Sequence, residues 1–247
     1  MNRFVKRPVL IFTFFSFLAC QVYAADSSGI TINQFRIVYN ASEKKGVTWS
    51  LTNNTELAYL MQSWIRPLDT ATGMPSTDAS RHRIPLLVTP PLKRVNPGEH
   101  FTVRIRLTEA SLPKDRESVF YLSVKGIPSM SDKTIQTGGQ MAVAVVNNIK
   151  LFYRPEGLPE GGVSKLLSQV RLSRKGKTLI VNNPTPFYLN FSQLIVGGKK
   201  VSAEDLRRLV PPKGEQSYLL PEGATGTVEW QVIDENNELT PLQHHSL

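Results

Sequence analysis

Polar and hydrophobic positions alternate along most of the chain after residue 25, with the two-residue period that is typical of β-strands. The segment 30–39, ITINQFRIVY, illustrates the pattern, because β-branched and aromatic residues dominate it. The same pattern predicts further strands at 47–53, 59–67, 84–89, 100–107, 118–124 and 140–153. Turn-forming residues such as Asn96-Pro97-Gly98 separate these segments. Seven strands at this spacing predict an immunoglobulin-like β-sandwich.

The segment 155–162, PEGLPEGG, interrupts the alternation and predicts a linker between two domains. A second series of strand-like segments follows it, at 169–174, 177–183, 188–197, 215–220 and 226–233. The stretch 164–172 is ambiguous, and 203–209 is compatible with a single helical turn. We therefore expect an all-β protein with a first β-sandwich domain at 25–156 and a smaller one at 157–247.

The segment 140–153 differs from the other predicted strands because both faces of its first half are apolar. One face holds Met141, Val143 and Val145, and the other holds Ala142, Ala144 and Val146. Such a strand either lies in the centre of a fold or is kept open for a partner. The pattern alone is also compatible with ordinary core residues. Lys150, a charge just beyond the apolar half, suggests instead a protein that lends this strand to another protein.

The N-terminus has the features of a secretory signal peptide. A basic start with Arg3, Lys6 and Arg7 precedes an apolar run at 9–19, and small residues lead up to Ala24. We predict cleavage after Ala24, so that the signal peptide is 1–24. A membrane anchor is a weaker interpretation, because spanning a bilayer takes about 20 apolar residues. The sequence therefore predicts an exported protein.

Charge and chemistry narrow the function further. The net charge of +9 falls to +6 without the three basic residues of the signal peptide, and the remaining basic residues are scattered, so we do not predict nucleic-acid binding. The single cysteine, Cys20, lies in the signal peptide, which excludes disulfides and thiolate chemistry from the mature chain. The histidines are His82, His100, His244 and His245. No G-x-S-x-G or complete phosphate loop occurs, so we expect no catalytic residue, metal, cofactor or small-molecule substrate.

Three blocks of sequence carry a resemblance to a known family. They are RIVYNASEKKGVTWSLTNN at 36–54, LPKDRESVFYLSVKGIP at 112–128 and NNIKLFYRP at 147–155. Together they resemble the periplasmic pilus (fimbrial) chaperones, the PapD-like family. Ser123 departs from the family pattern, in which Asn or Cys is usual. The segment NNPTPFY at 182–188 extends the resemblance into the second half.

The resemblance implies two immunoglobulin-like domains set at an angle, with a cleft between them. It implies that the cleft binds pilin subunits in the periplasm, that the seventh strand completes the subunit's sandwich, and that an outer-membrane usher receives the subunit. Met141, Val143 and Val145 would then be the donor residues, and Ala142, Ala144 and Val146 would face the chaperone's own core. The alternatives are an exported β-sandwich adhesin or binding module without a chaperone role, and a periplasmic hydrolase.

Further residue roles follow from the same resemblance. Arg36 and Lys150 fall at family positions that bind the C-terminal carboxylate of a pilin. Glu117, Arg154 and Asp234 fall at positions that form a structural salt bridge between the domains. Strict alternation places Lys150 on the opposite face from Val145, and a bulge at Asn147-Asn148 that resets the register remains open.

Two finer expectations also rest on the resemblance. The short span Ser129 to Gly139, together with the absent disulfide, resembles the short-loop subclass of these chaperones. The apolar strand further predicts that the free chaperone can self-associate to cover its edge.

Overall fold

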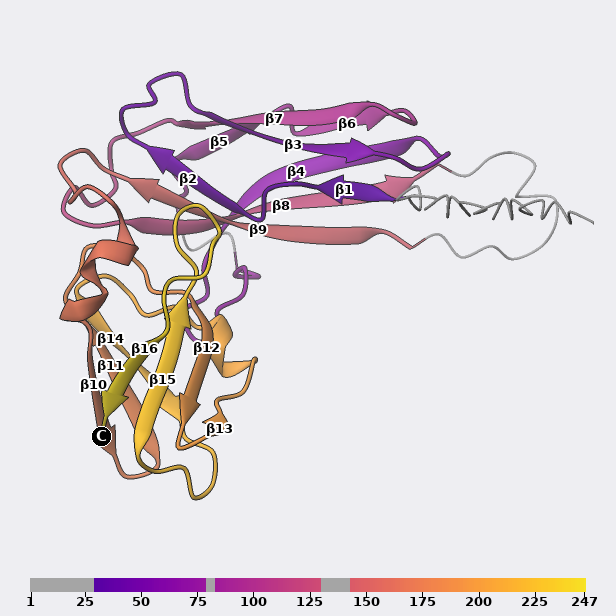
Figure 1. The fold of residues 1–247 in the computed structure, drawn as a ribbon. Coiled ribbons are helices and arrows are strands. Elements are labelled where there is room, and N and C mark those ends of the chain that lie inside the picture. The colour runs from indigo at the N-terminus through magenta and orange to yellow at the C-terminus, as the bar shows by residue number, and fades with distance from the viewer. Residues whose placement is uncertain (1–28, 79–82, 130–142) are drawn as a thin grey trace, which may run out of the picture.

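The computed structural model describes residues 29–78, 83–129 and 143–247, and it contains two β-sandwiches set at an angle (Figure 1). The predicted signal peptide and Met141 lie outside the described residues. Within the described part of the chain, no helix is long and apolar enough to cross a membrane. The all-β, two-sandwich fold predicted from the sequence is therefore confirmed.

The first sandwich consists of two sheets packed face to face. One sheet has the order β1 (Ile30–Ile32), β3 (Val47–Asn53), β7 (His100–Leu107) and β5 (Leu86–Thr89). The other has the order β2 (Arg36–Asn40), β9 (Val145–Arg154), β8 (Ser118–Pro128), β4 (Tyr59–Pro67) and β6 (Leu92–Val95). Inward-facing residues such as Trp49, Phe101 and Leu151 are buried between the sheets. This burial explains the alternation seen in the sequence.

The second sandwich has its own core. One sheet has the order β10 (Arg171–Lys175), β11 (Thr178–Asn183) and β14 (Gly214–Leu219). The other has the order β13 (Lys199–Lys200), β12 (Phe191–Val196), β15 (Thr227–Val232) and β16 (Gln243–Ser246). The 3₁₀ helices η2 (Val163–Gln169) and η3 (Asp205–Arg207) complete it. Phe187, Tyr218 and Trp230 are buried in this core.

The N-terminal segment predicted as one strand at 30–39 is two strands in different sheets. β1 pairs with β3, whereas β2 pairs in parallel with β9, so the chain crosses from one sheet to the other between Ile32 and Arg36. The indole Nε1 of buried Trp49 donates a hydrogen bond of 2.8 Å to the carbonyl oxygen of Gln34 within this crossover. The crossover therefore delivers Arg36 to the edge of β9.

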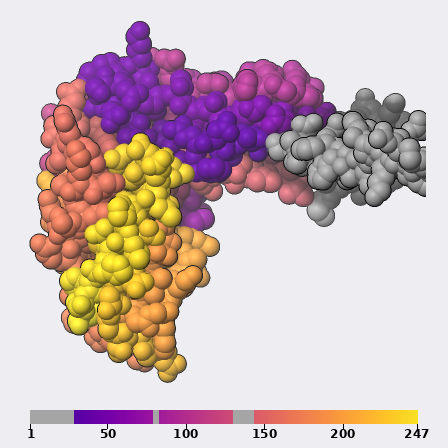
Figure 2. All heavy atoms as spheres, in the orientation of Figure 1, coloured from indigo at the N-terminus to yellow at the C-terminus, as the bar shows by residue number. Residues whose placement is uncertain are grey.

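The two sandwiches meet in a compact contact that mixes apolar and polar groups. Val119 and Phe152 of the first sandwich pack against Leu209 of the second, with Leu68 and Tyr188 beside them. In Figure 2 the surface is hollowed where the second sandwich meets the underside of the first. The outer face of β9 forms one wall of this hollow. The hollow is therefore a candidate binding site.

Candidate functional site at the edge of strand β9

The two ends of strand β9 differ in how many neighbours they have. β8 pairs with β9 from Val145 to Tyr153, but β2 pairs with it only from Lys150 to Arg154. Among the described residues, the stretch Val145–Ile149 therefore has a partner strand on one side only. An open edge of this kind is a template for another strand.

Two of the predicted donor residues lie at this open end and are exposed. Val143 is 63% exposed and Val145 is 56% exposed. Val145 lies on the same face of β9 as Ile149 and Leu151, which are buried in the core of the first sandwich. Apart from Asn147, which lies between Val145 and Ile149 on this face, the apolar row thus continues along the strand past the point where the protein's own core ends.

The other face of β9 corrects one prediction. Ala144 and Val146 were expected to face the protein's own core, but both are exposed, Val146 by 41%. The pairing of β8 with β9 runs without a shift from Gly126↔Val145 to Ser118↔Tyr153, so no bulge at Asn147-Asn148 resets the register. The expectation was wrong because this face, which also carries Lys150, lines the cleft between the sandwiches.

Arg36 and Lys150 lie side by side in this cleft, where they are direct partners in the parallel pairing of β2 with β9. Arg36 is only 4% exposed, and its guanidinium lies 3.9 Å from the centroid of the Phe152 ring. Its Nη1 donates to the Ile233 carbonyl at 3.2 Å, and Lys150 Nζ donates to Asn190 Oδ1 at 2.9 Å. All of these residues except Phe152 line a cavity of about 450 Å³.

The electrostatics of the pair favour an anionic ligand. Burial, together with the charge of Arg36, lowers the pKa of Lys150 to about 8. Burial also lowers the pKa of Arg36 to about 10, so both groups are charged at neutral pH. Within the described residues, neither cation has a carboxylate within 4 Å, and Arg36 Nε has no hydrogen-bond partner. A carboxylate entering the cleft would supply the missing acceptors.

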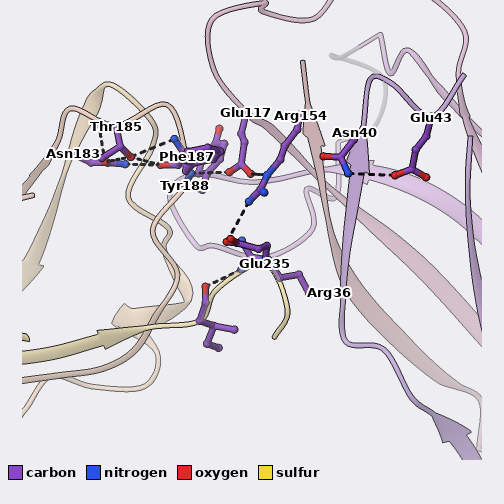
Figure 3. A network of polar contacts seen from close by, with 11 residues as sticks. Arg36, Asn40, Glu43, Glu117, Arg154, Asn183, Thr185, Phe187, Tyr188 and Glu235 are labelled. Carbon is purple, nitrogen blue, oxygen red and sulfur yellow. Dashed lines mark hydrogen bonds and ion pairs between the residues drawn. The ribbon is translucent and has the colours of Figure 1, made fainter. Parts of the chain in front are cut away.

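A separate ionic network connects the two sandwiches next to the cleft (Figure 3). Arg154 Nε lies 2.6 Å from Glu117 Oε1, and Glu117 Oε2 accepts a 2.8 Å hydrogen bond from the backbone N–H of Tyr188. The Arg154 guanidinium also lies 4.8 Å from the Phe187 ring centroid. Burial raises the pKa of Glu117, and Arg154 opposes that rise. The network therefore ties β8 and β9 to the second sandwich.

The third residue of this network differs from the one predicted. Glu235 Oε2 lies 3.6 Å from Arg154 Nη2, whereas the Asp234 carboxylate accepts hydrogen bonds of 2.9 Å from the backbone N–H groups of Asn236 and Glu238. Asp234 was thus predicted wrongly as the ion-pair partner, because its side chain stabilises the turn that follows β15. The Asn190 and Ile233 contacts to the cations were not predicted, since no local pattern links residues so far apart.

The comparisons with known proteins agree with this architecture of two immunoglobulin-like sandwiches and a one-sided strand at their cleft. The family "Pili and flagellar-assembly chaperone, PapD N-terminal domain" matches residues 29–159, and "Pili assembly chaperone PapD, C-terminal domain" matches 165–239. The chain therefore belongs to the PapD-like family of pilus-assembly chaperones.

Individual relatives match over nearly the whole chain. Chaperone protein FimC of Escherichia coli O6:H1 is 35% identical over 91% of this chain and 87% of its own length. The probable fimbrial chaperone LpfB of Escherichia coli O157:H7 is 33% identical over 90% of this chain and 88% of its own.

Solved structures that superpose on this chain are also pilus chaperones, like its relatives in sequence. The Escherichia coli chaperone DraB superposes with a TM-score of 0.72 and 31% identity, covering 89% of this chain and 98% of its own. A chain in the structure of the Salmonella enterica SafA pilin in complex with the SafB chaperone superposes with a TM-score of 0.75 and 27% identity, covering 89% of this chain and 96% of its own.

Proposed function

We propose that this protein captures pilus subunits in the periplasm by pairing the open edge of β9 with a subunit that lacks a strand, and then delivers them to an outer-membrane usher. The observation that carries the proposal is the one-sided stretch Val145–Ile149 with exposed valines beside it. Membership of the PapD-like family and the complex of SafB with the SafA pilin support it. The signal peptide 1–24 would direct the chain to the periplasm, with domains at 25–156 and 157–247.

The donor residues in this proposal are Met141, Val143 and Val145. Full burial of a valine side chain contributes about 1.5–3 kcal/mol, and these valines are already about 40% covered, so each adds about 1–2 kcal/mol. Ordering both partners opposes this gain. Because Val145 shares its face with the protein's own core residues, the subunit core would lie end to end with that core.

Arg36 and Lys150 would hold the C-terminal carboxylate of the subunit. Charge-assisted hydrogen bonds of this kind contribute about 1.5–3 kcal/mol each. Their second effect is positional, because a chain end fixed at Lys150 determines which subunit residues lie beside Val145. Glu117, Arg154 and Glu235 would keep the two sandwiches at the angle that places both parts of the site together.

The proposal includes no catalytic residue, cofactor or small-molecule substrate. Among the described residues, no group of three His, Cys, Asp or Glu side chains could hold a metal ion. The energy for keeping a subunit folded would come from binding alone. The open edge also leads us to propose that the free protein self-associates, and the short-loop subclass stays a prediction.

Co-expression with a pilus subunit from the same gene neighbourhood tests the function. We expect a 1:1 complex in the periplasmic fraction and protection of the subunit from protease. Arg36→Ala and Lys150→Ala should fold and fail to accumulate the subunit, whereas Lys177→Ala, an exposed lysine of the second sandwich, should behave as wild type. Normal accumulation with both cleft variants would refute the carboxylate anchor.

A further inference from the structure

The end of the second sandwich that points away from the first sandwich is strongly basic (Figure 1). It is formed by the turns that join β10 to β11, β12 to β13 and β14 to β15. In the segments 174–177, 197–200 and 220–226, five exposed basic residues outnumber the one acidic residue, Glu222, which gives a formal charge of +4. The basic residues are Arg174, Lys175, Lys177, Lys199 and Lys200. We call these three segments the basic tip.

Contacts between the turns join them into one surface. Arg174 Nη1 donates a hydrogen bond of 2.9 Å to the Ala224 carbonyl oxygen, and Lys199 Nζ donates one of 2.6 Å to the Glu222 carbonyl oxygen. Gly197 has a φ of +53°, and an added Cβ would lie 2.0 Å from a backbone oxygen of the same β14–β15 turn. The β14–β15 turn therefore lies against both of the other turns and fixes how far apart their cations are.

The charge of the basic tip is not neutralised by nearby acids. In the part of the chain that the structure describes, none of the five cations has a carboxylate within 4 Å. By contrast, the exposed Lys44 of the first sandwich lies 2.6 Å from Glu156. Arg174 and Lys199 donate to backbone carbonyls, which carry no net charge. The tip therefore presents a positive potential to solvent and favours an anionic partner.

A large apolar side chain lies beside these cations. Leu219, the last residue of β14, is 62% exposed, whereas its neighbours Tyr218 and Leu220 are buried. The strand pairing aligns Lys175 of β10 with Thr178 of β11, and Thr178 with Leu219, so Lys175 and Leu219 lie on the same outer face of the sheet. Cations beside an exposed leucine are typical of membrane-surface binding, in which lipid phosphates attract the cations and the apolar side chain enters the interface.

The basic tip lies at the opposite end of the second sandwich from the cleft. β11 begins at Thr178 in the tip and ends at Asn183, a length of about 17 Å. Asn183 Nδ2 donates a 2.7 Å hydrogen bond to the carbonyl of Phe187, whose ring lies beside Arg154 of the first sandwich. In Figure 2 this end of the second sandwich projects as a separate lobe. The tip can therefore touch a flat surface while the open edge of β9 stays free.

We propose that the basic tip, together with Leu219, binds the surface of a bilayer that contains anionic phospholipids. Five exposed cations on two separate turns match an extended charged surface, and Leu219 supplies the apolar contact that a purely electrostatic site would lack. The inference uses the exported location proposed above, which places the chain between two membranes, and it is independent of subunit capture. The tip would hold the protein at a membrane with its cleft turned away from the lipid.

Co-sedimentation of the full mature protein with lipid vesicles measures this binding. The vesicles consist of phosphatidylcholine alone or of phosphatidylcholine with about 30% phosphatidylglycerol, which is anionic. We expect binding to the anionic vesicles only. Because salt screens exposed charges, raising NaCl from about 0.1 M to about 0.5 M should lower the affinity about tenfold or more.

Two pairs of lysine substitutions separate the tip from the overall charge. A basic residue near an anionic surface contributes about fivefold in affinity, so Lys175→Gln combined with Lys177→Gln should lower the affinity about 25-fold. Lys45→Gln combined with Lys114→Gln changes the net charge equally, by removing two exposed lysines of the first sandwich. This control should bind within about twofold of the wild type, because its charges lie away from the lipid.

A fluorescent label tests whether Leu219 enters the lipid. The mature chain has no cysteine, so Leu219→Cys gives a single site for a nitrobenzoxadiazole label, whose emission rises in apolar surroundings. Leu239→Cys is the matched control, because Leu239 is 61% exposed and follows the turn after β15, at the other end of that strand from the tip. With anionic vesicles we expect the emission to rise about twofold or more at position 219 and to stay unchanged at position 239.

Several results would overturn the proposal. Equal losses in the two double variants would show that net charge, and not the tip, drives the binding. Release from the vesicles by soluble glycerol phosphate at constant ionic strength would indicate a site for a single anion. Binding to immobilised polyglutamate without binding to vesicles would assign the tip to an acidic protein surface. All variants should capture a subunit as the wild type does, so the vesicle and capture experiments can fail independently.

Discussion

Replacement of Lys150 by methionine should make the free protein more stable while removing subunit capture. Burial and the charge of Arg36 lower the pKa of Lys150 from 10.5 to about 8. A pKa difference of one corresponds to about 1.4 kcal/mol, so the protonated lysine costs the folded protein about 3 kcal/mol below pH 8. Methionine is uncharged and of similar length. Loss of the hydrogen bond to Asn190 removes about 1–2 kcal/mol of this stabilisation. The free energy of unfolding should therefore rise by a net of about 1–2 kcal/mol.

Urea unfolding of the wild type and Lys150→Met at pH 7 and pH 10 measures this effect. Between pH 8 and 10.5 the unfolded chain binds a proton at this lysine and the folded chain does not, so wild-type stability rises with pH from this source. The variant lacks that rise, and its advantage should therefore be largest at pH 7 and shrink by pH 10. Lys177→Met, which removes an exposed lysine, is the control.

Two results would contradict this reasoning. If Lys150→Met is less stable than the wild type at pH 7, the buried charge is not a burden on the fold. If the difference between the two proteins is the same at both pH values, its origin is not the proton on Lys150. Either result would also weaken the idea that the cation is retained for ligand binding at the expense of stability.

Three further predictions concern the edge, the anchor and the network. Val145→Glu should lower the affinity for the subunit by about 100-fold or more, because the new carboxylate would be buried in the subunit groove. An unchanged affinity in a pull-down titration would show that Val145 is not part of the site. Its urea midpoint should not move, since Val145 is 56% exposed, and Leu219→Glu is the matched control. Capture by the wild type should weaken as the pH rises above about 8, where Lys150 loses its proton, and an unchanged affinity from pH 7 to 9 in the same titration would contradict this role of Lys150. Glu117→Ala should lower the free energy of unfolding by about 3 kcal/mol or more, because it leaves the Arg154 guanidinium buried without its nearest carboxylate. A loss below about 1 kcal/mol would contradict a structural role for the Glu117–Arg154 ion pair.

Local alternation was enough to place many strands. The strands predicted at 47–53, 59–67 and 100–107 end at the same residues in β3, β4 and β7, because one face of each is buried and the other is not. The predicted helical turn at 203–209 is present as η3. Strands without an apolar period were missed: β16, which contains His244 and His245, lies beyond the last predicted strand at 226–233, yet it pairs with β15 through its backbone.

Features that depend on contacts between distant segments could not be predicted in the same way. An apolar face in the sequence does not reveal whether it lies against a core or a cleft, which is why Val146 was assigned to the wrong side. Two adjacent acids, Asp234 and Glu235, look equivalent in sequence, and only the turn after β15 decides which one faces Arg154. The positions of Arg36 and Lys150 came from family resemblance, and their contacts with Asn190 and Ile233 came from the structure alone.

The division of β9 into a half with two neighbours and a half with one has a consequence for how a bound subunit could leave. The segment Lys150–Tyr153 is paired with both β2 and β8, so release of a bound subunit strand does not require the protein's own sheet to open. A competing strand could begin to pair at the open end near Val145. It would then displace the bound subunit strand one residue pair at a time. Each step would exchange one set of backbone hydrogen bonds for an equivalent set. The free-energy barrier to transfer of the subunit would therefore stay low without an external energy source.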